Sequence, residues 1–254
     1  MLDEQLHPRS SAQRKFALSF ARNQTEMVEA QRLRYTVFAG EMGASLESAS
    51  DGIDEDRFDA YCEHLLVRDV ETAEVVGTYR VLSPAAASQA GGFYTEQEFD
   101  LARLAHLRGC MVEVGRSCIH PGYRSGGVIM LLWTGLLRYM VEHRHEYLIG
   151  CASISMADGG HAAASIFRAV ESRHMSPIEY RVFPRCRLPL ESLDAARTAA
   201  LPPLVKGYLN VGAYVCGEPS WDPDFNCADL PVLLSLHQLN QRHMRHFGVR
   251  DLSQ

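Results

Sequence analysis

The chain has 254 residues, of which 46% are hydrophobic and 22% charged, a composition typical of a globular protein with one sizeable core. Its formal net charge of -6 at pH 7 argues against nucleic acid as a partner, because phosphate binding needs a concentrated basic surface. The cysteines stand singly without a CxxC pair, and residues 1–11 are polar rather than signal-peptide-like, so we expect reduced thiols and a cytoplasmic location.

The first half of the chain predicts strands with one long helix. Phe16, Leu18 and Phe20 alternate with smaller residues in a first strand at 15–21. A helix follows from 23 to about 38, where Asn23 can cap the free N–H groups. Apolar runs at 64–69 and 75–82 predict a β-hairpin.

The second half predicts alternating helices and strands. The expected helices cover about 95–107, a buried segment from about 125, 158–170 and 229–247, and the expected strands cover 111–119, 147–154, 181–188 and 211–216. The longest apolar segment, 128–141, falls short of the roughly 20 residues that a membrane crossing needs, so we interpret it as a core helix.

Glu113 and Arg116 form the first pattern that can carry chemistry. They lie three apart in a predicted strand, and a bulge at Gly115 would bring both to one face. A structural ion pair explains the pattern equally well. In an aminolysis reaction, however, a carboxylate such as Glu113 can accept the proton of the attacking amine.

A glycine turn before the buried helix forms the second pattern. Its residues Arg124, Ser125, Gly126 and Gly127 would present backbone N–H groups to a phosphate at a helix N-terminus, or would form an ordinary tight turn. The loop resembles the coenzyme A loop of GNAT acetyltransferases without its final small residue, which is compatible with a donor that bears a single phosphopantetheine phosphate.

An acidic segment at 41–59 forms the third pattern. Asp54, Asp56 and Asp59 are explained by a solvated surface, or by a site for a diamine substrate. Neither these carboxylates nor the histidines show EF-hand or zinc spacing, so we expect no bound metal. The predicted last helix carries Leu233, Leu236 and Leu239, which suit packing on the core, and Arg242 and Arg245, which suit an anionic inner-membrane surface.

Several segments, in one order over nearly the whole chain, carry a resemblance to a known family. They are RYTVF at 34–38, Phe58-Asp59 with Cys62 and His64-Leu65, VGTYRVL at 76–82, FY at 93–94 with EF at 98–99, EVGRS at 113–117, LW at 132–133, GCAS at 150–153, PPLVKGYL at 202–209 and DPDFN at 222–226. In these segments the chain resembles the N-acyltransferases that make lyso-ornithine lipid from ornithine and 3-hydroxyacyl carrier protein. It is more distantly similar to acyl-homoserine-lactone autoinducer synthases.

The resemblance implies an α/β (α+β) GNAT-like fold, a mixed bent β-sheet flanked by helices, in which the acyl donor enters where two central strands splay apart. We expect a polar tail at 1–14, the acyltransferase core at 15–190 and a helical C-terminal extension at 191–254 packed on the core. The donor would be the phosphopantetheine thioester of acyl carrier protein, with no further cofactor, and the acceptor would be ornithine.

The same resemblance implies the roles of the charged residues. Glu113, Arg116 and Asp56 are expected to be catalytic; Arg34, Asp59, Arg80 and Ser153 to bind the acceptor; and Arg124, Ser125, Gly126 and Gly127 to bind the donor. Cys118 and Cys151 remain as alternative nucleophiles. Glycine, glutamine, lysine and tyrosine remain as alternative acceptors, and a non-catalytic carrier-binding or membrane-binding protein as an alternative function.

Overall fold

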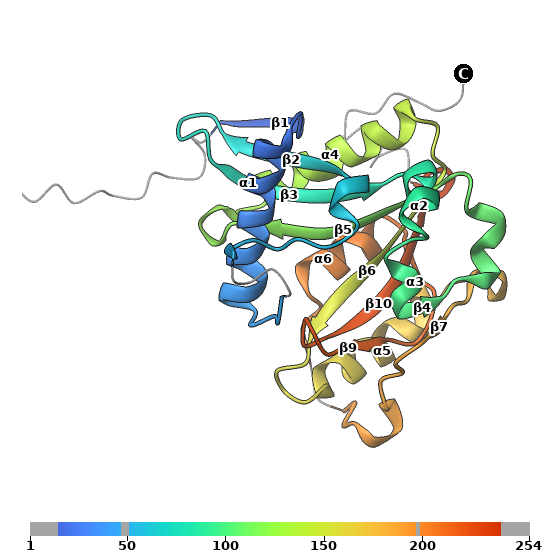
Figure 1. Cartoon of the computed structure of the whole chain (residues 1–254). Helices are drawn as coiled ribbons and strands as arrows, with labels where there is room; N and C mark the ends of the chain where they lie inside the picture. The colour runs from blue at the N-terminus through green and yellow to red at the C-terminus, as the bar shows by residue number, and fades with distance from the viewer. Residues whose placement is uncertain (1–14, 47–50, 197–198, 240–254) are drawn as a thin grey trace, which may run out of the picture.

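A computed structural model describes residues 15–46, 51–196 and 199–239 (Figure 1). Its main sheet has eight strands in the order β1-β2-β3-β5-β6-β10-β8, with β9 paired to β10. The strands are β1 (Phe16–Phe20), β2 (Glu63–Asp69), β3 (Val75–Leu82), β5 (Met111–Ile119), β6 (Tyr147–Ser155), β8 (Tyr214–Val215), β9 (Ser220–Asp222) and β10 (Cys227–Ser235). A second sheet pairs β4 (Phe99–Asp100) with β7 (Phe183–Pro184).

The helices are α1 (Gln24–Tyr35), α2 (Pro84–Ala90), α3 (Thr95–Glu98), α4 (Gly127–Glu142), α5 (His161–His174) and α6 (Pro203–Asn210), and α1 continues as a π-helix at Thr36–Glu41. Figure 1 shows α1 and α4 against the half of the sheet that contains β1, β2 and β3. Asn23 caps α1, as the sequence predicts, because its side chain accepts a hydrogen bond from the Glu26 N–H at 3.0 Å.

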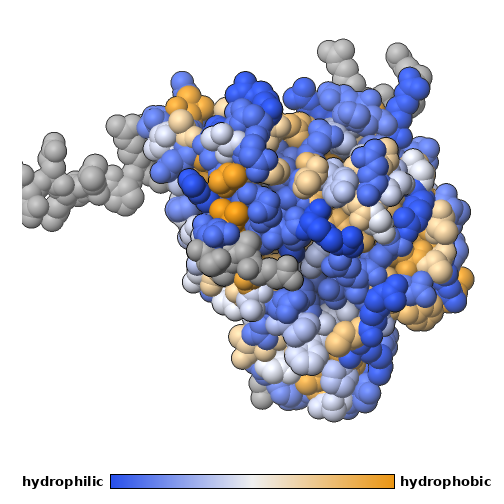
Figure 2. All heavy atoms as spheres, viewed as in Figure 1, coloured by the Kyte–Doolittle hydropathy of each residue, from blue (hydrophilic) through white to orange (hydrophobic). Residues whose placement is uncertain are grey.

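Side chains on the two faces of the sheet enter different clusters. Val112, Leu148 and Val232 pack with α4, α5 and α6, whereas Met111, Ile149 and Leu233 pack with α2 and the segment after it. Hydrophobic residues appear on the face viewed in Figure 2 only as small, separate patches, since most large apolar side chains are gathered in these clusters. Within the described ranges, no helix has both the length and the apolar character that crossing a bilayer requires.

The parallel strands β5 and β6 diverge in the middle of the sheet. They pair only at Met111–Tyr147, Val112–Leu148 and Glu113–Ile149; beyond Glu113, β5 pairs with β3 and β6 with β10. Figure 1 shows β6 and β10 turning away from β3 and β5. The predicted splay between two central strands is therefore confirmed.

The predicted bulge also exists, one residue beyond Gly115. Thr78 pairs with Cys118 and Arg80 with Gly115, so β5 holds one residue more than β3 over this stretch. Arg116 takes a φ of 51°, in the left-handed region that non-glycine residues rarely adopt. Bulges and positive φ values of this kind cluster at functional sites, where they redirect a side chain.

Three predicted elements are wrong. The helix expected at 229–247 is strand β10 up to Ser235, and its residues from 240 on lie outside the described part of the chain. β10 is buried on both faces, so its continuous apolar run carries no period-two signal. The expected strand at 181–188 is reduced to β7, and the expected helix at 95–107 is divided by β4 into α3 and a 3-10 helix at Ala102–Leu107.

The C-terminal segment after residue 190 therefore contributes β8, β9 and β10 to the main sheet, where β10 pairs with β6 along its full length. This differs from the expected helical extension lying on a completed core. Leu233, Leu236 and Leu239 are buried, as the core-packing alternative requires.

Candidate active site

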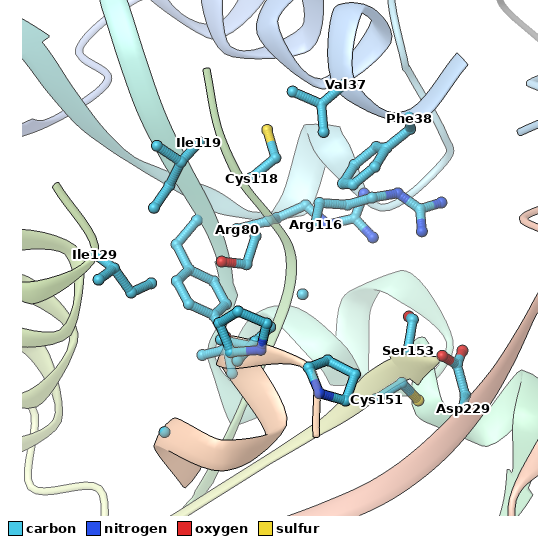
Figure 3. Close-up of a pocket in the computed structure, with 18 of the residues that line it drawn as sticks. Val37, Phe38, Arg80, Arg116, Cys118, Ile119, Ile129, Cys151, Ser153 and Asp229 are labelled. Atoms are coloured by element: carbon cyan, nitrogen blue, oxygen red, sulfur yellow. The ribbon is translucent and has the colours of Figure 1, made fainter. Parts of the chain in front are cut away.

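A cavity of about 730 Å³ opens where β5 and β6 diverge. Its polar lining includes Arg80, Glu113, Arg116, Ser153, Asp222 and Asp229, and its apolar lining includes Ile119, Ile129, Met130, Trp133, Leu204 and Val211. Figure 3 shows Ile119 and Ile129 on one side, with Arg80 and Arg116 facing Ser153 and Asp229 across the space. The cavity therefore joins a charged end, suited to a small polar molecule, to apolar walls suited to a hydrocarbon chain.

Three arginines and three aspartates form a largely buried cluster behind one wall of the cavity, which only Arg80 and Arg116 of the cluster line. We call it the arginine–aspartate cluster: Arg34, Arg80, Arg116, Asp54, Asp56 and Asp59. Arg34 binds Asp59 through two N–H···O bonds of 2.8 and 2.9 Å, and its Nε donates to Asp54 at 2.8 Å. Arg34 and Asp59 are each 1% exposed and line no part of the cavity. In this structure neither side chain reaches the predicted substrate site, and Asp59 instead accepts bonds from Arg80 at 3.4 Å and from the Asp56 N–H at 2.8 Å.

Asp56 joins the two arginines that face the cavity. Its carboxylate accepts bonds from Arg80 at 2.6 Å and from Arg116 at 3.1 Å. Burial opposes ionisation, but the two guanidinium groups hold the pKa of Asp56 below its usual value. Asp54, Asp56 and Asp59 thus form neither a solvated surface nor a free diamine site, because each is paired with arginine.

Glu113 lies at the last paired position before the splay and is 4% exposed. Its Oε2 accepts the Tyr94 N–H at 2.6 Å, and its Oε1 accepts the Thr95 N–H at 2.6 Å and the Thr95 hydroxyl. Burial raises the pKa of Glu113, although these bonds oppose the rise. A carboxylate offers about four lone-pair sites, so one remains for a molecule in the cavity.

The predicted donor loop is divided by the structure. Arg124 and Gly126 line the cavity, whereas Ser125 and Gly127 do not. Gly126 precedes the first turn of α4 with a φ of 102°, a conformation that glycine permits. Arg124 forms two bonds of 2.6 and 2.7 Å with Glu41, so its charge is already paired.

The cysteines at the cavity are neutral thiols. Burial raises the pKa of Cys118 to about 12 and lifts that of Cys151 well above its ordinary value. Nucleophilic catalysis requires a thiolate, which neither environment favours.

Sequence analysis missed Asp222 and Asp229, which are 5% and 3% exposed. Asp229 was expected to begin a helix, and Asp222 was noted only within the DPDFN segment. Register brings them together, because β9 and β10 are antiparallel neighbours. Among the described residues, their carboxylate oxygens and the sulfur of Cys227 lie within 4.8 Å of one another.

The sequence of the chain is similar to sequences of named proteins. A protein of Brucella abortus (strain 2308) named L-ornithine N(alpha)-acyltransferase is 34% identical over 247 residues, which cover 90% of this chain and 87% of the relative. The chain belongs to the L-ornithine N(alpha)-acyltransferase family. Residues 33–134 also match the family described as acetyltransferase (GNAT) domain.

Solved structures confirm the fold expected for this family. The crystal structure of the AHL synthase LasI aligns with a TM-score of 0.54 at 13% identity, covering 95% of this chain and 99% of that chain. FeeM, an N-acyl amino acid synthase from uncultured soil microbes, aligns with a TM-score of 0.56 at 13% identity, covering 92% and 100%. These structures confirm the predicted GNAT-like fold, and the named relatives with the matched acetyltransferase domain confirm the predicted acyltransferase class.

Proposed function

We propose that this enzyme transfers a 3-hydroxylated long-chain acyl group from acyl carrier protein to the α-amine of ornithine, forming lyso-ornithine lipid. The observation that carries the proposal is that the cavity at the β5–β6 splay joins paired charges to apolar walls. The acyl chain occupies the apolar part, near Trp133 and Leu204, and ornithine occupies the charged part. Membership of a family named for ornithine acylation supports this choice of acceptor.

In the proposed reaction the neutral α-amine attacks the thioester carbonyl and forms a C–N bond. Glu113 accepts the proton that the nitrogen loses, through its remaining lone pair or one water molecule. Backbone N–H groups beyond Gly115, where the bulge interrupts the strand pairing, stabilise the oxyanion. Collapse breaks the C–S bond, and the thiol leaves with the proton returned by Glu113.

Arg116 receives the α-carboxylate of the acceptor in this arrangement. Its guanidinium lines the cavity between the rings of Tyr94 and Phe225, with its centre 4.9 and 4.3 Å from the ring centroids. These rings and Asp56 hold the guanidinium in one orientation, which favours bidentate recognition of a carboxylate. The loop at Gly126 offers backbone N–H groups to the phosphopantetheine phosphate of the donor.

The test is thiol release from 3-hydroxypalmitoyl carrier protein, with ornithine, lysine, glutamine, glycine or no acceptor, and mass spectrometry of the products. The proposal requires ornithine-dependent release and an Nα-acyl product. Another preferred acceptor would keep the mechanism and replace the substrate. Binding of the carrier protein without release, by the folded protein, would identify a non-catalytic carrier-binding protein.

A further inference from the structure

The wall opposite the arginine–aspartate cluster carries two buried carboxylates, Asp222 and Asp229, which we call the acidic pair. Both line the cavity, and their neighbours across the β6–β10 and β9–β10 pairings include Ser153 and Ser220. Figure 3 places Asp229 and Ser153 across the space from Arg80 and Arg116. The two ends of the cavity therefore present opposite charges to one bound molecule.

The acidic pair differs from the arginine–aspartate cluster in forming no ion pair within the described ranges, and the more distant charge of Arg116 lowers the pKa of Asp229 only in part. Within the described ranges, no lysine, arginine or histidine forms an ion pair with either carboxylate, whereas the cluster matches each aspartate with arginine. Asp229 accepts only from neutral groups, the Cys227 thiol at 3.5 Å and the Ser153 hydroxyl. Asp222 accepts the N–H groups of Asp224 and Phe225 at 2.9 and 3.1 Å.

Buried carboxylates without a counter-charge are costly, and a cation in the cavity would relieve that cost. Burial, with Asp222 nearby, raises the pKa of Asp229 to about 6, and burial together with the acidic pair raises that of Glu98 to about 7. Both pKa values are raised, which agrees with the geometry, because Asp222, Asp229 and Glu98 lie close together and the residues around them do not fully balance their negative charge.

We propose that Asp229 and Asp222 bind the side-chain ammonium group of the acceptor and thereby select a diamino acid. This inference rests on the proposed function and assigns the substrate's second amine to a definite wall of the same cavity. An ammonium group has three N–H donors, which match the two carboxylates and the Ser153 hydroxyl. Oxygen atoms within 4.8 Å of one another are close enough to share one nitrogen.

The assignment also explains which amine reacts. An amine held between two carboxylates stays protonated and has no lone pair to attack a thioester. Arg116 holds the α-carboxylate on the opposite wall, so the α-amine lies between the two anchors, in the cavity that Glu113 also lines. The acidic pair therefore directs acylation to Nα as well as choosing the acceptor. Asp56 and Asp59 cannot fill this role, because arginines already neutralise them.

The test compares ornithine with norvaline, which has the same carbon chain without the second amine, in the wild-type enzyme and in Asp229→Asn. For the wild type, kcat/KM for norvaline is expected to be about 100-fold lower than for ornithine. Asp229→Asn is expected to lower kcat/KM for ornithine by about 100-fold and to leave that for norvaline unchanged within about threefold. Asp100→Asn, at an exposed position outside the cavity, is the control and should change neither.

The outcomes separate this inference from the proposed function. If the wild type releases no thiol with ornithine, the proposed function fails. If ornithine is used and norvaline works equally well, only the acidic-pair inference fails. An equal loss with both acceptors in Asp229→Asn would instead make Asp229 part of the acyl-transfer chemistry. Loss of wild-type activity on addition of EDTA, restored by a divalent metal ion, would assign the acidic pair to a metal.

A fold control accompanies these assays. Asn is nearly isosteric with Asp, and binding of ornithine alone can be followed by the shift it causes in the melting temperature. Ornithine is expected to raise the melting temperature of the wild type and of Asp100→Asn, but not of Asp229→Asn. Equal stabilisation of all three proteins would overturn the inference without reference to turnover.

Discussion

Glu113 is held by three donors from Tyr94 and Thr95, and the proposed base therefore has little freedom to move. Replacing Glu113 with Gln is expected to lower kcat by about 100-fold or more, because the amide cannot accept the amine proton. Single-turnover thiol release measures this loss directly. A folded Glu113→Gln protein with a near-native rate would exclude Glu113 as the base.

Thr95→Val gives a second test of Glu113 that keeps the glutamate itself, so its result does not depend on how the site accommodates the Gln side chain of Glu113→Gln. The Thr95 hydroxyl bond lowers the pKa of Glu113, so its removal is expected to raise that pKa. The acidic limb of the kcat/KM–pH profile should then move to higher pH, while the rate well above it stays close to that of the wild type. An unmoved limb would show that a group other than Glu113 controls it.

Single residues could be predicted where a local motif contains them. Glu113 and Arg116 stand three apart in one strand, so spacing and resemblance together single them out. Arg34 and Asp59 were also selected, but their contact spans 25 positions of sequence, and only the fold shows that they are buried. Asp229 was not predicted as a site residue, because an acidic residue before an apolar run is also typical of the start of a helix.

At the scale of elements, the splay depends on how closely β5 and β6 approach before they part. A Cβ atom at Gly150 would lie 2.5 Å from the Val114 carbonyl oxygen, so Gly150→Ala must push the two strands apart. We expect a loss of about 1–3 kcal/mol in the free energy of unfolding, measured by urea titration, together with reduced activity.

Gly109→Ala is the matched control for this prediction. Its Cβ would meet nothing within 4 Å and its φ is not in the left-handed region, so stability should change by less than about 0.5 kcal/mol. Equal stability of Gly150→Ala and wild type would show that the strands tolerate a wider separation.

Elements were predictable from sequence where one face differs from the other. β1 alternates half-buried and exposed side chains, which gives a period-two signal. The strands β2 and β3 are buried along most of their length, and the hairpin is predicted instead by two apolar runs joined by a short polar link. β10 is buried on both faces, and its leucines suit a helix as well as a strand. The bulge was expected at Gly115 and occurs beside it, where Arg116 takes the positive φ and β5 holds one residue more than β3.

At the scale of the whole molecule, buried carboxylates with lowered and with raised pKa values make the stability of the fold depend on pH in opposite directions. The arginine–aspartate cluster lowers the pKa values of Asp56 and Asp59 below 3.8, so its contribution is present near neutral pH and lost as the pH falls through those values. Asp229 of the acidic pair and the nearby Glu98 act in the reverse direction. Asp229 and Glu98 have raised pKa values of about 6 and about 7, so the folded state binds extra protons.

The stability that these protons supply is complete below the ordinary values of 3.8 and 4.5 and is lost as the pH rises through about 6 and 7. The free enzyme should therefore be most stable on the acidic side of neutrality. Asp229→Asn removes the buried charge, so its melting temperature should exceed that of the wild type by a few degrees at about pH 8 and by much less at about pH 5. Differential scanning fluorimetry at both pH values, with Asp100→Asn as the reference, measures this difference. A melting temperature that falls equally at both pH values would mean that the Asp229 carboxylate is satisfied in the free protein, and the wall would then have no unmet charge for a substrate ammonium to fill.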